Sequence, residues 1–186
     1  VTVSSVTSLK DIVDQVNQRM PDSSIIVAVT LNGKQLEEDW MTRQQSLYVM
    51  EEDTLELEAR QAEDLGREAF RKSHEQFELI CEDFQRIAEM FRLDDETLAN
   101  TFLAQAVDNL QSFLRIVQES LILMRRTFSE LTIDGKPAPQ FIEQFSTKLS
   151  EVINIQKNND WVLLADVIEY DLVPLLGMIE CIYQQA

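Results

Sequence analysis

The sequence predicts a small α+β domain followed by an all-α domain, because the spacing of its apolar residues changes near Arg60. Before that residue, short apolar runs such as residues 24–29 and 54–58 suit strands, whose side chains alternate between two faces. After it, apolar residues recur every three or four positions, which is the repeat of amphipathic helices. We therefore expect two domains, at residues 1–60 and 61–186.

The first domain is expected to hold one helix and several short strands. Ser8 can cap a helix, and Pro21 marks its end. Asn32-Gly33 is the strongest turn signal in the chain. The expected order is a strand at residues 1–3, a helix after Ser8, a strand at residues 25–31, a short strand at residues 35–36 and a strand at residues 54–58.

Three stretches of this domain follow a pattern found in a known fold family. Residues 33–37 are Gly-Lys-Gln-Leu-Glu, residues 53–57 are Asp-Thr-Leu-Glu-Leu, and residues 7–13 are Thr-Ser-Leu-Lys-Asp-Ile-Val. They resemble, respectively, the turn after the third strand, the last strand and the start of the helix of ubiquitin-like β-grasp domains. The resemblance covers about the first 60 residues and implies an interaction scaffold.

The chain departs from that family at two places. The first strand of the β-grasp is missing unless it precedes Val1, and a helix follows Arg60 where conjugated members carry a Gly-Gly tail. The second departure argues against conjugation or sulfur carriage.

The second domain is expected to be an all-α antiparallel four-helix bundle. Four apolar stripes at helical spacing are separated near residues 93–96, 132–139 and 157–159. Because these connections are short, neighbouring helices should run in opposite directions. Pro174 should kink the fourth helix rather than end it, since the apolar spacing continues beyond the proline.

The charge of the chain restricts its partners. The net charge is −17. Residues 1–60 hold 5 basic and 11 acidic side chains, or −6, which leaves −11 for the rest. This sign disfavours nucleic acid and anionic membranes. The negative charge has two interpretations. Either it serves only to keep the protein soluble, or it attracts a basic partner. With no membrane span and no secretory signal in the sequence, we expect a cytoplasmic protein.

Catalytic chemistry finds little support in the residue types. His74 is the only histidine, and it shares an apolar stripe with Phe70 and Phe77, which favours a core or boundary position over phosphotransfer. Cys81 lies about 10 Å along the helix from His74, beyond hydrogen-bond reach. Cys81 and Cys181 are expected to be reduced thiols. We expect no catalytic residue, no metal and no cofactor.

With catalysis disfavoured, binding to another protein is the expected function, and six residues are the candidates for the binding site. The fourth helix is apolar around more than half of its circumference, so it is either fully buried, which we favour, or partly exposed to a partner. The candidate partner-binding residues are Trp40, Tyr48, Trp161, Asp166, Glu169 and Tyr170.

Three functional hypotheses follow. The first is an adaptor or chaperone-like protein that binds a basic or amphipathic protein segment. The second is a self-assembling structural protein that forms a homodimer through the fourth helix. The third is a phosphotransfer protein that depends on His74.

Overall fold

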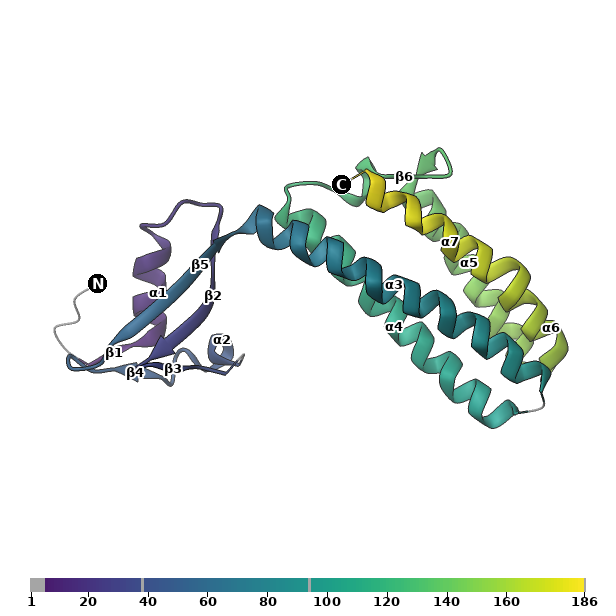
Figure 1. Cartoon of the computed structure of the whole chain (residues 1–186), viewed down its shortest axis with the longest axis horizontal. Helices are drawn as coiled ribbons and strands as arrows, with labels where there is room; N and C mark the ends of the chain where they lie inside the picture. Colours follow the sequence, from purple (N-terminus) through teal and green to yellow (C-terminus); the bar gives the residue numbers. More distant parts are fainter. Residues whose placement is uncertain (1–5, 38, 94, 186) are drawn as a thin grey trace. The chain divides into compact units, whose positions relative to one another are not determined.

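The computed structural model describes residues 6–37, 39–93 and 95–185. The chain divides into two compact units, Val1–Leu65 and Gly66–Ala186. The first is mixed and contains small sheets, and the second is mostly helical (Figure 1). The units meet in the first turn of helix α3 (Ala62–Arg92), a few residues beyond the boundary expected at Arg60. The strand expected at residues 1–3 lies outside the described residues.

In the first unit, helix α1 (Leu9–Asn17) precedes an antiparallel three-stranded sheet of order β3-β2-β5, and β1 pairs with β4 in a second small sheet. Ser8 caps α1, because its Oγ accepts a hydrogen bond from the amide of Asp11 at 3.2 Å. The strands are β1 (Thr7–Ser8), β2 (Ser24–Leu31), β3 (Lys34–Gln35), β4 (Tyr48–Val49) and β5 (Leu55–Gln61).

The turn between β2 and β3 has the backbone that Asn32-Gly33 predicts. Asn32 has φ 52° and Gly33 has φ 76°, the left-handed region that a tight hairpin requires. The Asn32 side chain also donates to Oδ1 of Asp53 at 2.7 Å and accepts from the amide of Thr54 at 2.9 Å. These bonds hold the turn against the start of β5. The bond from Asn32, together with one from the amide of Met50, lowers the pKa of Asp53.

The core of the first unit is formed by one face of α1, by inward residues of β2 and by the short helix α2 (Trp40–Arg43). Its fully buried members are Leu9, Val13, Ile26, Val29 and Trp40. The register of β2 shifts between Ile26 and Ala28, so the two core residues of the strand, Ile26 and Val29, are three positions apart rather than two.

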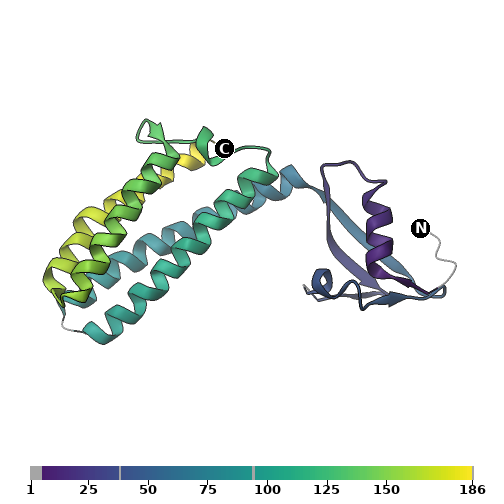
Figure 2. The ribbon, with the colours of Figure 1, turned by 180° about the vertical axis from the view of Figure 1, so that it is seen from behind.

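The second unit is built from long helical segments that lie side by side in both views (Figures 1 and 2). The loop expected at residues 132–139 contains a small hairpin, whose turn places Asp134 and Gly135 at positive φ. After α3 the elements are α4 (Glu96–Leu123), the 3₁₀ turn η1 (Phe128–Glu130), β6 (Thr132–Ile133), β7 (Lys136–Pro137) and α5 (Ala138–Lys157).

The last helical segment changes its type along its length. It comprises α6 (Trp161–Asp166), the π-helical turn η2 (Val167–Leu172), α7 (Val173–Gly177) and the 3₁₀ segment η3 (Met178–Gln184). The π turn directly precedes Pro174, whose missing amide cannot bond the carbonyl of Tyr170. Wider π turns of this kind are a common cause of helix distortion.

The segment from α6 to η3 is not buried on all sides, which corrects the favoured expectation of a fully buried helix. Leu164, Ile168 and Leu172 are completely buried against the other helices. Val162, in contrast, is 67% exposed and Leu163 is 45% exposed. The off-stripe apolar residues therefore remain on the surface of this unit.

Candidate functional site

The most distinctive polar arrangement in the second unit surrounds Arg92, the last residue of α3. Its Nη2 donates a hydrogen bond to Oδ1 of Asp166 at 2.8 Å, and its Nη1 donates to Oε2 of Glu169. The guanidinium carbon also lies 5.6 Å from the centre of the Tyr170 ring, as in a cation–π contact. We call Arg92, Asp166, Glu169 and Tyr170 the Arg92 cluster.

Helical spacing brings the three residues of the last segment together. Glu169 and Tyr170 follow Asp166 by three and four positions, so each lies near Asp166 on the surface of the helix. The end of α6 and the π turn η2 carry them, and α3 supplies the cation. Two acids and one ring thus converge on a single guanidinium.

In the Arg92 cluster one guanidinium is paired with two carboxylates, and the groups remain partly open to solvent. The hydrogen bonds that Arg92 donates to Asp166 and Glu169 raise the pKa of Arg92 above its ordinary value. About a third of the Arg92 side chain and nearly half of the Asp166 side chain are exposed. Exposed ion pairs contribute little net stability because water and salt screen them. The cluster therefore contributes little to the stability of the fold.

Trp161 lies next to this cluster and anchors the start of α6. Its ring stacks on that of Phe91, with centroids 5.6 Å apart and planes inclined by 6°. Phe91 is buried and directly precedes Arg92. Four of the six candidate residues, namely Trp161, Asp166, Glu169 and Tyr170, therefore contact the last two residues of α3.

Exposed apolar residues border the cluster on the same helical segment. Val162 and Leu163 precede Asp166 by four and three positions, and Tyr170 is 65% exposed. We call Val162, Leu163, Asp166, Glu169 and Tyr170 the α6 surface. It combines apolar and acidic groups, which is the chemistry that a basic amphipathic segment would complement.

Trp40 and Tyr48 belong to the first unit and have different environments. Trp40 is only 5% exposed and packs in the core with Leu9 and Val29. Trp40 is therefore a core residue of the first unit rather than an exposed anchor for a partner. Tyr48 is exposed on the short strand β4.

His74 is held by neighbours on two sides. Its Nε2 lies 3.1 Å from Oε1 of Glu180, and its ring meets that of Tyr183 edge-on at 4.6 Å. The Tyr183 hydroxyl lies 2.9 Å from Oγ of Ser73, which itself donates to the carbonyl of Phe70 at 2.7 Å. Either hydroxyl can be the donor in the bond between Ser73 and Tyr183.

Two ionisable groups near His74 are kept neutral by burial. Desolvation raises the pKa of Tyr183 to about 12, against the opposing effect of the hydrogen bond with Ser73. Desolvation also raises the pKa of the Cys81 thiol to about 11, and the charges of Glu180 and Glu78 add to the shift. Because the thiolate is the nucleophilic form, this shift disfavours reaction of the Cys81 thiol at neutral pH.

The described residues provide no cluster of three or more His, Cys, Asp or Glu side chains that could hold a metal ion. Within the same residues, none of the helices combines the length and hydropathy needed to cross a bilayer.

The sequence reasoning missed Phe91 and Arg92 as parts of the site. The available signal was a basic residue in the last turn of the first predicted long helix, which also suits the helix macrodipole. Because the macrodipole already explains a basic residue at this position, the sequence did not indicate that Arg92 pairs with residues more than seventy positions later.

A comparison with protein families gives one result for this part of the chain. The family described as "Domain of unknown function (DUF8042)" matches residues 68–180, which is more than half of the chain and includes the Arg92 cluster. No curated protein and no solved structure matches the chain.

Proposed function

The chain belongs to the DUF8042 family, and we propose that it is a non-enzymatic interaction protein that binds a basic or amphipathic segment of a partner protein. The α6 surface would be the binding site, and an adaptor or chaperone-like role would follow. We place this activity in the cytoplasm.

The Arg92 cluster is the observation that carries this proposal. Asp166, Glu169 and Tyr170 already accommodate one guanidinium from within the chain. A Lys or Arg side chain of a partner would meet the same two carboxylates and the same ring. Val162 and Leu163 beside them would contact the apolar residues of an amphipathic helix.

The charge of the chain supports the same partner class. The net charge of −17 attracts basic segments at long range and speeds their encounter. No Lys or Arg follows Lys157 in the sequence, so the segment that carries the α6 surface has no cation of its own.

The proposal includes a finer description of the fold. We infer that the first unit is a ubiquitin-like β-grasp domain, which the antiparallel order β3-β2-β5 and the preceding α1 support. We infer that the second unit is an antiparallel four-helix bundle, with the segment from α6 to η3 as its fourth helix. Both folds commonly serve as interaction scaffolds, an argument from analogy alone.

A peptide selection tests the partner class directly. The purified full chain would be immobilised and used to select from a random peptide library displayed on phage. We expect enriched sequences to combine Lys or Arg with apolar residues at helical spacing. Enrichment of acidic or uncharged sequences, or enrichment that is unchanged in a Val162→Asp variant, would contradict the proposal.

Self-assembly is the second candidate, because the exposed side chains of Val162, Leu163 and Tyr170 could also pair with a second copy. Sedimentation velocity at micromolar concentration separates the two candidates. A strict monomer excludes the homodimer, and a dimer that Val162→Asp dissociates would favour it.

Phosphotransfer by His74 has less support. Its Nε2 is engaged with Glu180, and its ring packs against Tyr183. Incubation with a phosphoryl donor such as acetyl phosphate should leave the protein unmodified, and phosphorylation that a His74→Ala variant abolishes would revive this candidate.

A further inference from the structure

A pocket of about 480 Å³ opens beside α3 in the second unit, separate from the α6 surface. Its lining residues come from three places: α3, the residue after α4 and the C-terminal segment η3. They are Arg67, Phe70, Arg71, His74, Glu75, Met124 and Tyr183. The volume lies within the range of small-molecule sites in proteins.

The inner wall of the pocket is apolar and aromatic. Phe70 is buried, Met124 is nearly so, and the Tyr183 ring lies 4.9 Å from that of Phe70. Because the Tyr183 hydroxyl is bonded to Ser73, Tyr183 presents its ring rather than its polar atom. This wall suits a hydrocarbon or aromatic group.

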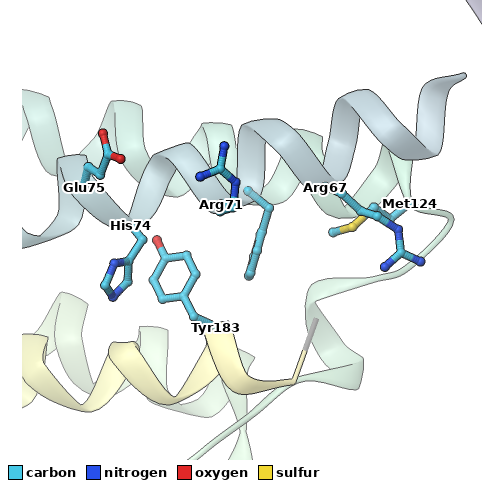
Figure 3. Close-up of a pocket in the computed structure, with 7 residues that line it drawn as sticks. Arg67, Arg71, His74, Glu75, Met124 and Tyr183 are labelled. Carbon is cyan, nitrogen blue, oxygen red and sulfur yellow. The ribbon is translucent and has the colours of Figure 1, made fainter. Parts of the chain in front are cut away.

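The rim of the pocket is basic at its arginine end. Arg67 and Arg71 stand one helical turn apart on α3, and His74 and Glu75 follow them. At the His74 end, Glu180 and Glu78 lie 3.1 Å and 3.9 Å from the nitrogen atoms of the His74 ring. Figure 3 shows Arg67 beside Met124, His74 beside the Tyr183 ring, and Arg71 between them along α3. Within the described part of the chain, no carboxylate lies within ion-pair distance of Arg71. A basic rim is unusual on a chain whose net charge is −17.

The His74 ring is fixed in position at one end of this rim. Glu180 contacts its Nε2 at 3.1 Å, and the Tyr183 ring packs against it. The wall that a ligand would meet is therefore formed in advance, so that little ordering of side chains is needed on binding.

From this arrangement we propose that the pocket binds a small organic carboxylate with an aromatic or alkyl body. The apolar group lies against Phe70, Met124 and the Tyr183 ring. The carboxylate lies at the rim, where the guanidinium of Arg71 donates charge-assisted hydrogen bonds to it. The planar fork of an arginine matches the geometry of a carboxylate.

The test uses 4-phenylbutyrate as the probe and the full chain as the receptor. Since His74 is the only histidine, its ring proton signals report the pocket without ambiguity in an NMR titration. We expect saturable shifts of these signals in the millimolar range or below. The uncharged isostere 4-phenylbutanamide and inorganic phosphate, which lacks the apolar body, should each bind about tenfold more weakly or worse.

Variants distinguish a direct contact between Arg71 and the carboxylate from an effect of the overall charge of the protein. Arg71→Ala should weaken the binding of 4-phenylbutyrate about tenfold, and Arg71→Lys should retain part of it. Arg115→Ala removes the same charge from an exposed position on α4 and should leave binding unchanged. A folded Arg71→Ala protein is verified by an unchanged far-UV circular dichroism spectrum.

Three results would overturn the proposal. One is the absence of saturable shifts up to about 10 mM probe. The second is equal affinity for the carboxylate and the amide, or for phosphate and the carboxylate. The third is an Arg115→Ala variant that loses as much affinity as Arg71→Ala.

Discussion

Arg92 at the end of α3 donates a hydrogen bond to Asp166 at the end of α6, with 2.8 Å between Nη2 and Oδ1. Glu169 and Tyr170 complete the contact on the same face. The chain thus occupies its own acidic and aromatic surface with one internal cation. A partner that brings a second cation would either displace Arg92 or bind beside it.

Removal of Arg92 distinguishes these two modes of binding. If a basic residue of the partner takes the place of Arg92, the Arg92→Ala variant should bind a basic amphipathic peptide more tightly than the wild type. Fluorescence anisotropy of a labelled peptide measures this change. If Arg92 and the peptide bind side by side, the affinity should instead change little, and competition for the same carboxylates would be excluded.

The packing of α3 against α4 should depend on Gly66. A Cβ at this position would lie 2.6 Å from the carbonyl oxygen of Ser120 and 2.9 Å from Cβ of Leu123. Gly66→Ala should therefore lower the free energy of unfolding by about 1–3 kcal/mol, as overpacking does. Urea denaturation measures the loss.

Gly177 provides the matched control for this substitution. It lies in α7, and a Cβ there would meet no atom within 4 Å. Gly177→Ala should raise the free energy of unfolding by about 0.5–1 kcal/mol, because alanine is the better helix former. Equal losses in both variants would show that the space around Gly66 is not restrictive.

Two buried serines should respond in opposite directions to removal of their hydroxyls. Ser120 Oγ has no hydrogen-bond partner among the described residues, so Ser120→Ala should leave stability unchanged or raise it. Ser73 Oγ bonds both the carbonyl of Phe70 and the Tyr183 hydroxyl, so Ser73→Ala should cost about 1 kcal/mol or more. Thermal denaturation of both variants checks this, and a larger loss for Ser120→Ala would contradict the assignment.

Alkaline pH should destabilise the second unit through Tyr183 and Cys81. Their pKa values rise from ordinary values of 10.0 and 9.0 to about 12 and 11 in the folded chain. The folded state therefore holds these protons more strongly than the unfolded state. The resulting stability is complete below about pH 9 and is lost as the pH rises through about 11 and 12.

The measurement is the denaturation midpoint between pH 8 and pH 12, with the Tyr183→Phe and Cys81→Ala variants as comparison. Each variant lacks one of the two ionisable groups, so each should lose less stability than the wild type over this range. Identical pH profiles for the wild type and both variants would contradict the role of burial.

Local signals in the sequence predicted much of the fold. The cap at Ser8, the turn at Asn32-Gly33 and the disturbance near Pro174 depend on a few neighbouring residues, and each is present in the structure. The last one takes the form of a π turn before the proline. The sequence identifies the missing amide but not how the packed helix adjusts to it.

Long-range packing accounts for what the sequence could not predict. Trp40 stands near acidic residues and was a candidate for partner binding, but it packs in the core of the first unit with residues of α1. Asp166, Glu169 and Tyr170 were candidate partner-binding residues, and the structure places all three against Arg92. Their pairing with Arg92 depends on how α3 meets α6, a relationship between residues far apart in the chain.

The most direct test of partner binding at the α6 surface compares two matched substitutions. Val162→Asp places a charge on this surface, whereas Ile122→Asp places one at a similarly exposed position on α4, 63% exposed against 67%. The measured quantity is the dissociation constant of a basic amphipathic peptide selected on the wild-type chain. We predict that Val162→Asp weakens binding at least about tenfold and that Ile122→Asp leaves it unchanged. Equal affinities in the two variants would contradict the assignment of the site.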